Sequence, residues 1–293
     1  MEDFEEGIYA AALTPMHPDL NCHFLELANH CRDLIQRGCK GVVLFGTTGE
    51  GPSFSIKERL EALEKVIEEG INPKTIILGN GGANIPETVE LGLGALKSNC
   101  TTLLTAPPTF FKNVAEEGVI AFYREIIQRI AHPNLRIILY HFPAYTCVPI
   151  TLKIIAALHS EFPDRVIGIK NSEGNLSFDK AVIDAFPGFK VFVGNESHII
   201  EAVHYGASGS ICGIANLYPE LVCSLFEQGK RGNSVNPNEL DMISQALRKY
   251  PFIAAMKALM EKKRGSAWHV LRPPLLPLNS SQISEELFQE HVS

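Results

Sequence analysis

A lysine stands at the end of an apolar run, where its amine is placed for covalent chemistry. Residues 165–170 read RVIGIK, and the small polar run NSEG follows directly. Burial disfavours the charged form of an amine, and a neutral amine attacks carbonyl carbons to form a Schiff base. The same pattern also fits a snorkelling surface residue, or a lysine paired with a carboxylate such as Glu173. Lys170 is therefore a candidate nucleophile with two structural alternatives.

Two further features carry groups that suit the same chemistry. The segment GTTGEG at 46–51 has glycines that allow tight turns. The hydroxyls of Thr47 and Thr48, together with backbone amides, would suit a small carboxylate. Tyr140 ends the apolar run 135–140, where its phenol could relay protons. A glycine-rich turn and an aromatic residue that only packs explain these features equally well.

The elements that must position these groups alternate between short strands and longer helices. Strands joined by helical crossovers run parallel to one another. About eight such units in roughly 230 residues predict a closed (β/α)8 barrel, the TIM barrel, within the α/β class. The strands are expected at residues 7–14, 41–45, 75–80, 101–106, 135–140, 165–170, 190–195 and 208–213. The helices are expected at residues 23–37, 55–70, 85–98, 115–131, 151–160, 176–186, 197–205 and 217–229.

The chain is expected to divide into a barrel at 1–230 and a C-terminal helical extension at 231–293. From about residue 236 the pattern is helical only, apart from a rigid proline-rich connector at 271–278. Active sites of TIM barrels lie at the carboxyl ends of the strands. Lys170, Tyr140 and the GTTGEG segment should therefore meet at one mouth.

Composition and charge exclude several classes of partner. A net charge of −7 without a long basic run argues against nucleic acid and anionic membrane surfaces. No apolar run approaches the roughly 18 residues of a membrane span. Seven cysteines without a CxxC pair, and an acidic opening segment, predict a cytoplasmic protein with reduced, buried thiols. His198 and His204 lie six residues apart on an expected helix and make no metal pair.

The motifs, in this order, resemble the dihydrodipicolinate synthase/N-acetylneuraminate lyase family. The resemblance rests on GTTGEG, on LYHFPA at 139–144, on IGIKNSEGN at 167–175 and on RPPLLPL at 272–278. It implies a barrel that assembles into a homo-oligomer, a dimer or tetramer, and binds pyruvate or another 2-oxo acid as a Schiff base. No metal or organic cofactor is implied.

The resemblance also assigns roles to individual residues. Lys170 matches the Schiff-base lysine, and Tyr140 the tyrosine that moves protons at the substrate. Thr47 and Thr48 match the pair beside the carboxylate of the 2-oxo acid. The backbone at Gly194 and Ile211 matches positions that line the pocket. Asn195, Glu196 and Ser210 are further candidate contacts to substrate hydroxyls, although a solvated loop would explain them too.

Two departures from the synthase pattern are visible. Tyr145 stands where the synthases have an arginine for the carboxylate of aspartate semialdehyde, and a phenol lacks a cationic fork. The segment APPTFFKN has Phe110 and Phe111 where the synthases place a tyrosine that crosses a subunit interface.

Four functions remain open from the sequence. The first is a class I lyase that cleaves or dehydrates a 2-oxo sugar acid through Lys170. The second is dihydrodipicolinate synthase itself, with Tyr145 or a basic residue elsewhere in place of the arginine. The third is a non-catalytic pyruvate-binding barrel. The fourth is a pyridoxal phosphate enzyme that uses the same lysine, which would be yellow.

Overall fold

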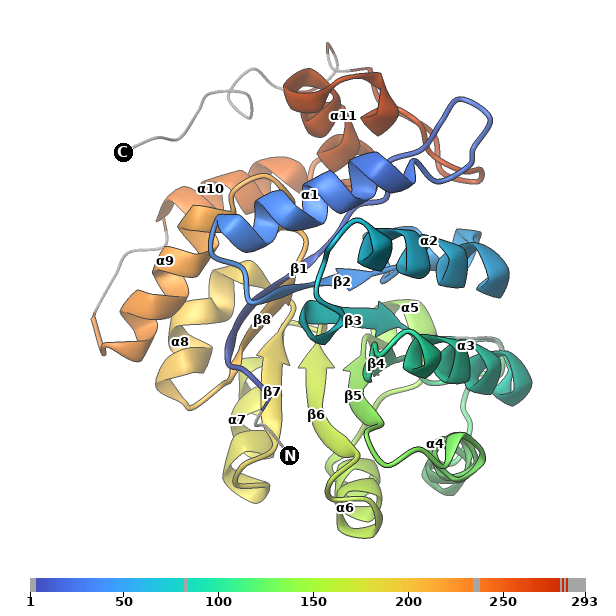
Figure 1. The fold of residues 1–293 in the computed structure, drawn as a ribbon. Helices are drawn as coiled ribbons and strands as arrows, with labels where there is room; N and C mark the ends of the chain where they lie inside the picture. Colours follow the sequence, from blue (N-terminus) through green and yellow to red (C-terminus); the bar gives the residue numbers. More distant parts are fainter. Residues whose placement is uncertain (1–3, 82–83, 234–237, 280, 282, 284–293) are drawn as a thin grey trace.

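Eight parallel strands close into a barrel in a computed structural model that describes residues 4–81, 84–233, 238–279, 281 and 283. The strands neighbour one another in chain order, and the last pairs with the first (Figure 1). This confirms the predicted (β/α)8 barrel. The strands are β1 Gly7–Ala11, β2 Gly41–Leu44, β3 Ile76–Gly79, β4 Thr102–Thr105, β5 Arg136–His141, β6 Val166–Asn171, β7 Lys190–Val193 and β8 Gly209–Cys212.

The strands are apolar because both of their faces are covered. Alternate residues point to opposite faces of a strand, so the barrel has two separate cores. One fills the interior and includes Val43, Ile77 and Phe192. The other lies between the strands and the surrounding helices and includes Val42 and Leu44 of the same β2 strand. Near-continuous hydrophobic runs in the sequence follow from this double burial.

Helices follow the strands around the outside of the barrel (Figure 1). All eight predicted helices are present, with boundaries that shift by a few residues. A short helix, α5, was not predicted. The helices are α1 Phe24–Gln36, α2 Ile56–Glu68, α3 Ile85–Lys97, α4 Glu116–Ile130, α5 Pro143–Thr146, α6 Leu152–Glu161, α7 Leu176–Ala185, α8 Ile199–His204 and α9 Pro219–Lys230.

The C-terminal extension begins with two helices, α10 Asn238–Leu247 and α11 Phe252–Arg264. A short 3-10 turn, Ser266–Trp268, follows, and Trp268 is fully buried against His30 of α1. The chain from 269 to 279 is not helical, so the non-helical segment includes the connector expected at 271–278 and extends a little beyond it. Prolines at 273, 274 and 277 explain this, because proline lacks the N–H that a helix needs. The connector predicted at 271–278 lies in this segment, whereas residues 280, 282 and 284–293 of the expected extension lie outside the described residues.

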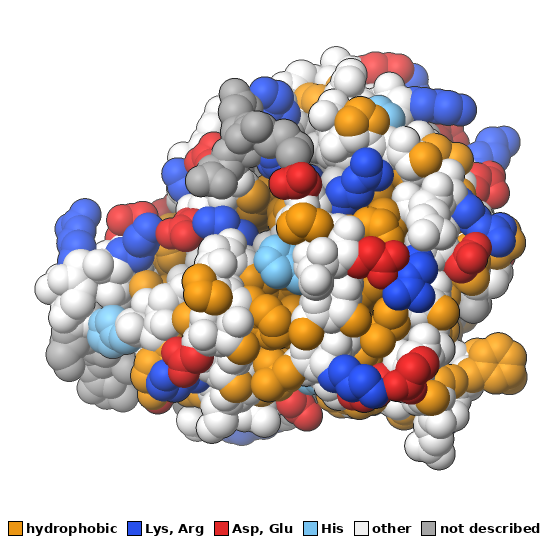
Figure 2. Space-filling model, turned by 90° about the horizontal axis from the view of Figure 1, so that it is seen from below, with side chains coloured by type: hydrophobic (Ala, Val, Ile, Leu, Met, Phe, Trp, Pro, Cys, Tyr) orange, Lys and Arg blue, Asp and Glu red, His pale blue; other side chains and the backbone are white. Residues whose placement is uncertain are grey.

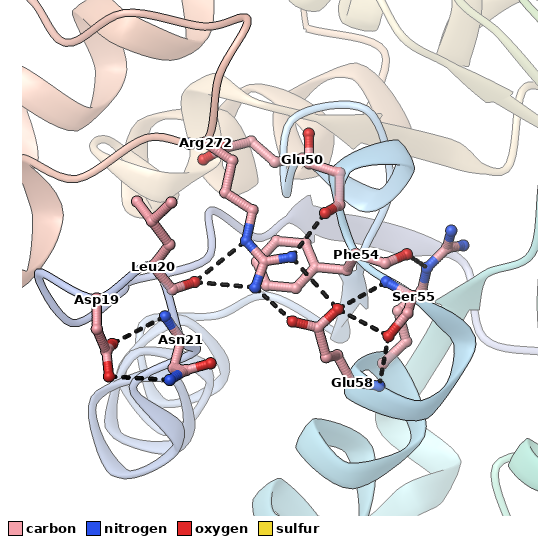
Figure 3. A network of polar contacts seen from close by, with 10 residues as sticks. Asp19, Leu20, Asn21, Glu50, Phe54, Ser55, Glu58 and Arg272 are labelled. Carbon is pink, nitrogen blue, oxygen red and sulfur yellow. Dashed lines mark hydrogen bonds and ion pairs between the residues drawn. The ribbon is translucent and has the colours of Figure 1, made fainter.

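Arg272 joins the connector to the start of α2 (Figure 3). Its guanidinium donates to the carbonyls of Leu20 (2.9 Å) and Ser53 (2.6 Å), and it pairs with Glu58 at 2.5 Å. The same group lies over the ring of Phe54, 3.9 Å from its centroid. An arginine with this many fixed partners holds the non-helical segment against the barrel.

Glu58 gives this junction a measurable dependence on pH. The ion pair with Arg272, helped by hydrogen bonds from Ser55, lowers the pKa of Glu58 from 4.5 to about 2. The unfolded chain therefore binds a proton before the folded chain does as the pH falls. We expect this contribution to stability to be full above pH 4.5 and to disappear between pH 4.5 and about 2.

Urea unfolding at a series of pH values in this window tests the expectation. The control is Glu58→Gln, because glutamine at this position keeps the capping box that Ser55 and Glu58 form at the start of α2. The loss of stability on acidification should be smaller in the variant than in the wild-type protein. Equal losses in the two proteins would contradict the role given to Glu58.

The surface carries mixed charges in the view of Figure 2. Lysine and arginine side chains alternate with aspartate and glutamate around a hydrophobic middle, and no continuous positive surface covers this face. Exposed ion pairs such as Arg124–Glu161 and Lys153–Glu117 join opposite charges on the surface of the protein. No helix within the described residues is long and apolar enough to cross a membrane.

All seven cysteines are free, and most are buried, but Cys147 is exposed, so the expectation that all of them pack in the core is wrong there.

Candidate active site

A large cavity opens at the carboxyl ends of the strands. Its volume is about 1370 Å³, and its walls come from the segment after β2, from the ends of β5 to β8, from α10 and from the connector. Lys170, Tyr140, Thr47 and Thr48 all line it. The predicted meeting of three separate segments at one mouth is therefore present in the structure.

Lys170 lies deep in this cavity. It belongs to β6, its register partner on β5 is Tyr140, and its side chain is only 6% exposed. The amine lies 4.7 Å from the centroid of the Tyr140 ring. Among the described residues, no carboxylate lies within ion-pair distance of this amine. Glu173, the partner that the sequence suggested, pairs instead with His141 at 3.3 Å. The two alternatives, a snorkelling residue and a partner of Glu173, do not fit this geometry.

The phenol of Tyr140 is held by a hydroxyl from another segment. Its oxygen lies 3.2 Å from Oγ1 of Thr47, within hydrogen-bonding distance. Tyr140 is 7% exposed, whereas Thr47 is half-buried, so the pair lies on the inner wall of the cavity. The phenol therefore has a proton partner on one side and the amine of Lys170 near its ring.

The turn that carries Thr47 and Thr48 is tight because two glycines make close contacts with backbone atoms. A Cβ at Gly51 would lie 1.9 Å from the carbonyl oxygen of Phe45. A Cβ at Gly49 would lie 2.7 Å from the carbonyl oxygen of Ala12, the residue that follows β1. No other residue fits at such distances. The backbone N–H of Gly51 also donates to the carbonyl of Gly46 at 3.0 Å, which closes the loop.

A buried ion pair anchors this turn to the extension. Glu50 has a left-handed backbone conformation, with φ of 57°. Its carboxylate lies 2.5 Å from the amine of Lys257 on α11, and both side chains are 0% exposed. The carboxylate also accepts the backbone N–H of Arg272 at 3.1 Å (Figure 3). Lys257 donates in turn to the carbonyl of Val270 at 2.6 Å, so the threonine turn and the extension form one buried polar unit.

The ends of β7 and β8 complete the inner wall. Gly194 and Ile211 line the cavity, where the sequence placed them. Glu196 lines it too and is 8% exposed. Its carboxylate accepts the backbone N–H groups of Gly213 (3.1 Å) and Ile214 (3.2 Å). These two hydrogen bonds use part of its acceptor capacity within the fold. Burial raises the pKa of Glu196 more than the hydrogen bonds lower it.

The remaining predicted contacts divide into two groups. Asn195 and Tyr145 line the cavity, and Tyr145 is 66% exposed at its rim. Ser210 does not line it, and its hydroxyl donates instead to the carbonyl of Val193 at 2.7 Å. The placement of Ser210 at the mouth is wrong because its neighbour Ile211 points inward, and adjacent strand residues point to opposite faces.

Several residues of the cavity were not predicted from the sequence. The cavity is also lined by Ser244 of α10, by Arg248 just after α10, by Phe252 of α11 and by the connector residues 274–278. These segments carried only a helical or proline-rich pattern, which does not tell which face turns toward the mouth. Phe110 and Phe111, in contrast, do not line the cavity and are 78% and 68% exposed.

The described residues contain no group of three histidine, cysteine or acidic side chains that could hold a metal ion. Whether the protein uses a cofactor stays a prediction from the sequence. The inner wall offers hydroxyls, backbone groups and a single amine. These groups suit a ligand that carries an uncharged carbonyl beside a carboxylate.

Comparison with known proteins agrees with the fold. A lyase described as DapA-like but uncharacterised, from Chloroflexus aurantiacus, is 31% identical over 281 residues, which cover 95% of this chain and 93% of the relative. The crystal structure of dihydrodipicolinate synthase from Agrobacterium tumefaciens is 30% identical and superposes with a TM-score of 0.88 over 94% of this chain and 95% of that one. A 2-keto-3-deoxygluconate aldolase from Picrophilus torridus shares the fold at 24% identity, with a TM-score of 0.85 over 94% and 98% of the two chains. Residues 4–289 match the dihydrodipicolinate synthetase family, and the chain therefore belongs to this family of lyases and aldolases.

Proposed function

We propose that the protein is a class I lyase that binds pyruvate or a related 2-oxo acid as a Schiff base on Lys170. The observation that carries the proposal is the 6% exposed amine without an acidic partner, beside the Tyr140 phenol in a cavity at the strand ends. A dry amine of this kind is the nucleophile that carbonyl chemistry requires. The hydroxyls of Thr47 and Thr48 line the same wall and would bind the carboxylate of the 2-oxo acid.

The reaction follows from these groups. The amine of Lys170 adds to the oxo carbon, and the hydroxyl formed there leaves as water with a proton from Tyr140, which gives an iminium ion. This ion accepts the electron pair of the bond between the carbon attached to it and the next, hydroxyl-bearing carbon as that bond breaks, while the hydroxyl proton of the departing aldehyde returns to the oxygen of Tyr140. The resulting enamine takes up a proton at carbon, and water then releases the 2-oxo acid and the free lysine. In dehydration the same iminium ion would instead lose a proton from the carbon attached to it, and the enamine formed would expel the hydroxyl of the next carbon as water with a proton from Tyr140.

Tyr140→Phe tests the proton transfer. Its ring would still pack beside Lys170, but the hydroxyl that lies 3.2 Å from Thr47 would be gone. We expect kcat to fall about 10²- to 10⁴-fold, the usual contribution of a positioned acid–base group. Reductive trapping of pyruvate, followed over time, should show a slower but complete reaction. An unchanged kcat would contradict the assignment.

The synthase reaction is the second candidate, favoured by the 30% identity to the Agrobacterium tumefaciens enzyme. Tyr145 at the rim offers no cationic fork for the carboxylate of aspartate semialdehyde. Two assays separate the candidates: pyruvate release from 2-oxo-3-deoxy sugar acids, and condensation of pyruvate with aspartate semialdehyde. We expect pyruvate release from the sugar acids to be faster than the condensation. A faster condensation would establish the synthase instead.

Two other readings have distinct signatures. A non-catalytic barrel would be stabilised by pyruvate in thermal unfolding but would turn over none of these substrates. A pyridoxal phosphate enzyme would absorb visible light as purified, and we expect a colourless protein.

Assembly and location complete the proposal. We propose a cytoplasmic homo-oligomer, a dimer or tetramer. The exposed rings of Phe110 and Phe111 support a contact between subunits, because large apolar side chains on a surface commonly mark interfaces. Sedimentation analysis of the wild-type protein would show the state directly.

A further inference from the structure

The C-terminal end of α10 lies at the cavity, and the residue that follows this helix brings an arginine to the rim. Ser244 of α10 and Arg248, which directly follows the last residue of α10, both line the cavity. The backbone N–H of Arg248 donates to the carbonyl of Ser244 at 3.0 Å, which continues the helical hydrogen bonding by one residue. Ser244 is buried, whereas Arg248 is exposed. Arg248 therefore stands at the outer part of the cavity, while Lys170 stands at its buried end.

The guanidinium of Arg248 reaches the end of a barrel strand. One of its terminal nitrogens donates to the side-chain oxygen of Asn195 at 3.2 Å. Asn195 follows Gly194, and both line the cavity next to the strand that carries Lys170. This contact places the arginine over the part of the cavity where a substrate longer than pyruvate would extend.

The charges around the cavity leave this arginine without an acidic partner. Lys170 and Arg248 are the lysine and arginine side chains among the described residues that line it. The two lining glutamates are engaged elsewhere, Glu173 with His141 and Glu196 with two backbone N–H groups. Within the described part of the chain, no carboxylate forms an ion pair with Arg248, whereas Arg37, Arg124 and Arg264 each have one.

We infer that Arg248, with Asn195 and Ser244, forms a subsite for a second acidic group on the substrate. The inference rests on the proposed function, because it places the 2-oxo acid head at Lys170 and the acidic group at the rim. A guanidinium with free N–H groups binds a carboxylate or a phosphate in a two-pronged contact. The cavity volume of about 1370 Å³ leaves room for such a longer molecule. The preferred substrates are therefore 2-oxo acids with a carboxylate or phosphate on the aldehyde half.

The test compares three kinds of 2-oxo acid of matched length: one ending in a carboxylate, one ending in a phosphate, and one ending in a neutral hydroxymethyl group. Each is cleaved by the wild-type enzyme, by Arg248→Gln and by Lys249→Gln. Glutamine keeps a donor for Asn195 but removes the charge. Lys249 is an exposed neighbour that does not line the cavity, and its variant is the matched control.

We expect the wild-type enzyme to prefer at least one acidic substrate over the neutral one. In Arg248→Gln the ratio of kcat/KM for that substrate to kcat/KM for the neutral one should fall about 10- to 100-fold, the effect of losing a hydrogen bond between charged groups. In Lys249→Gln the ratio should not change. The acidic substrate whose kcat/KM falls most in Arg248→Gln shows whether the subsite binds a carboxylate or a phosphate.

The outcomes separate this inference from the proposed function. A wild-type enzyme that forms no borohydride-reducible adduct with pyruvate contradicts the Schiff-base proposal itself. A normal adduct, with a substrate ratio that is unchanged in Arg248→Gln, overturns the subsite alone. Equal losses on acidic and neutral substrates also overturn it, because they would mean that Arg248 only supports the fold of the rim.

Discussion

Replacing Lys170 with methionine is expected to abolish turnover while the barrel stays folded. Methionine fills a similar volume with an apolar side chain, and the site is 6% exposed, so packing is retained. The reaction, however, loses the only atom that forms a covalent bond with the substrate. We expect kcat to fall on the order of 10⁴- to 10⁶-fold, as for other enzymes that lose their nucleophile. Steady-state assays with the best 2-oxo acid would measure this fall.

Lys180→Met is the matched control for this experiment. Lys180 is an exposed lysine on α7 that pairs with Asp184. A surface pair of this kind contributes little to stability, so activity and stability should both stay near the wild-type values. If Lys170→Met retained more than a small fraction of the activity, while Lys180→Met behaved normally, a Schiff base on Lys170 would be excluded.

The second large effect is expected at the buried pair of Glu50 and Lys257. Both side chains are 0% exposed, and burial lowers the pKa of Lys257 even though Glu50 opposes the shift. Lys257→Met would leave the Glu50 carboxylate buried without its partner. Breaking a buried pair in this way typically lowers the free energy of unfolding by about 3–5 kcal/mol. Chemical unfolding of the wild-type protein and the variant would measure the difference.

The double variant Glu50→Gln with Lys257→Met shows whether the loss comes from the unpaired charge. Glutamine can still accept the backbone N–H of Arg272, so most of the local contacts remain. We expect the double variant to be clearly more stable than Lys257→Met alone. Because Thr47 and Thr48 lie in the same turn as Glu50, the single variant should also raise KM for pyruvate. Additive losses in the double variant would contradict the ion pair.

The barrel could be predicted from the sequence because its strands are buried on both faces. Most of the strands appear as short, mainly apolar runs, and the helices that follow have apolar residues on one side. The position of Lys170 followed from the same rule, since active sites of this fold lie at the strand ends. Local rules also explain the start of α2, where Ser55 and Glu58, three residues apart, form a reciprocal capping box.

The direction of individual side chains was harder to predict. Ser210 and Ile211 are neighbours in β8, and a shift of one residue decides which of them faces the cavity. Apolar runs contain no polar alternation that would fix this choice. Gly46 was expected to matter for the threonine turn, but a Cβ there would make only an ordinary contact, and the close approaches are at Gly49 and Gly51.

Contributions from the extension could not be predicted because they depend on tertiary packing. Arg248 directly follows a helix, α10, whose pattern gives no sign of a nearby cavity. Lys257 is a lysine within an apolar helix, and the sequence does not reveal that its amine meets Glu50, more than 200 residues earlier. Both contacts arise only when α10, α11 and the connector cover the mouth of the barrel.

Reductive trapping tests the central claim most directly. The wild-type protein is incubated with pyruvate and sodium borohydride, digested, and analysed by mass spectrometry. We predict one added pyruvate-derived group per chain, located on the peptide that contains Lys170, and none in Lys170→Met. A protein that stays unmodified at Lys170, or that is labelled equally on exposed lysines such as Lys180, would contradict the Schiff-base mechanism.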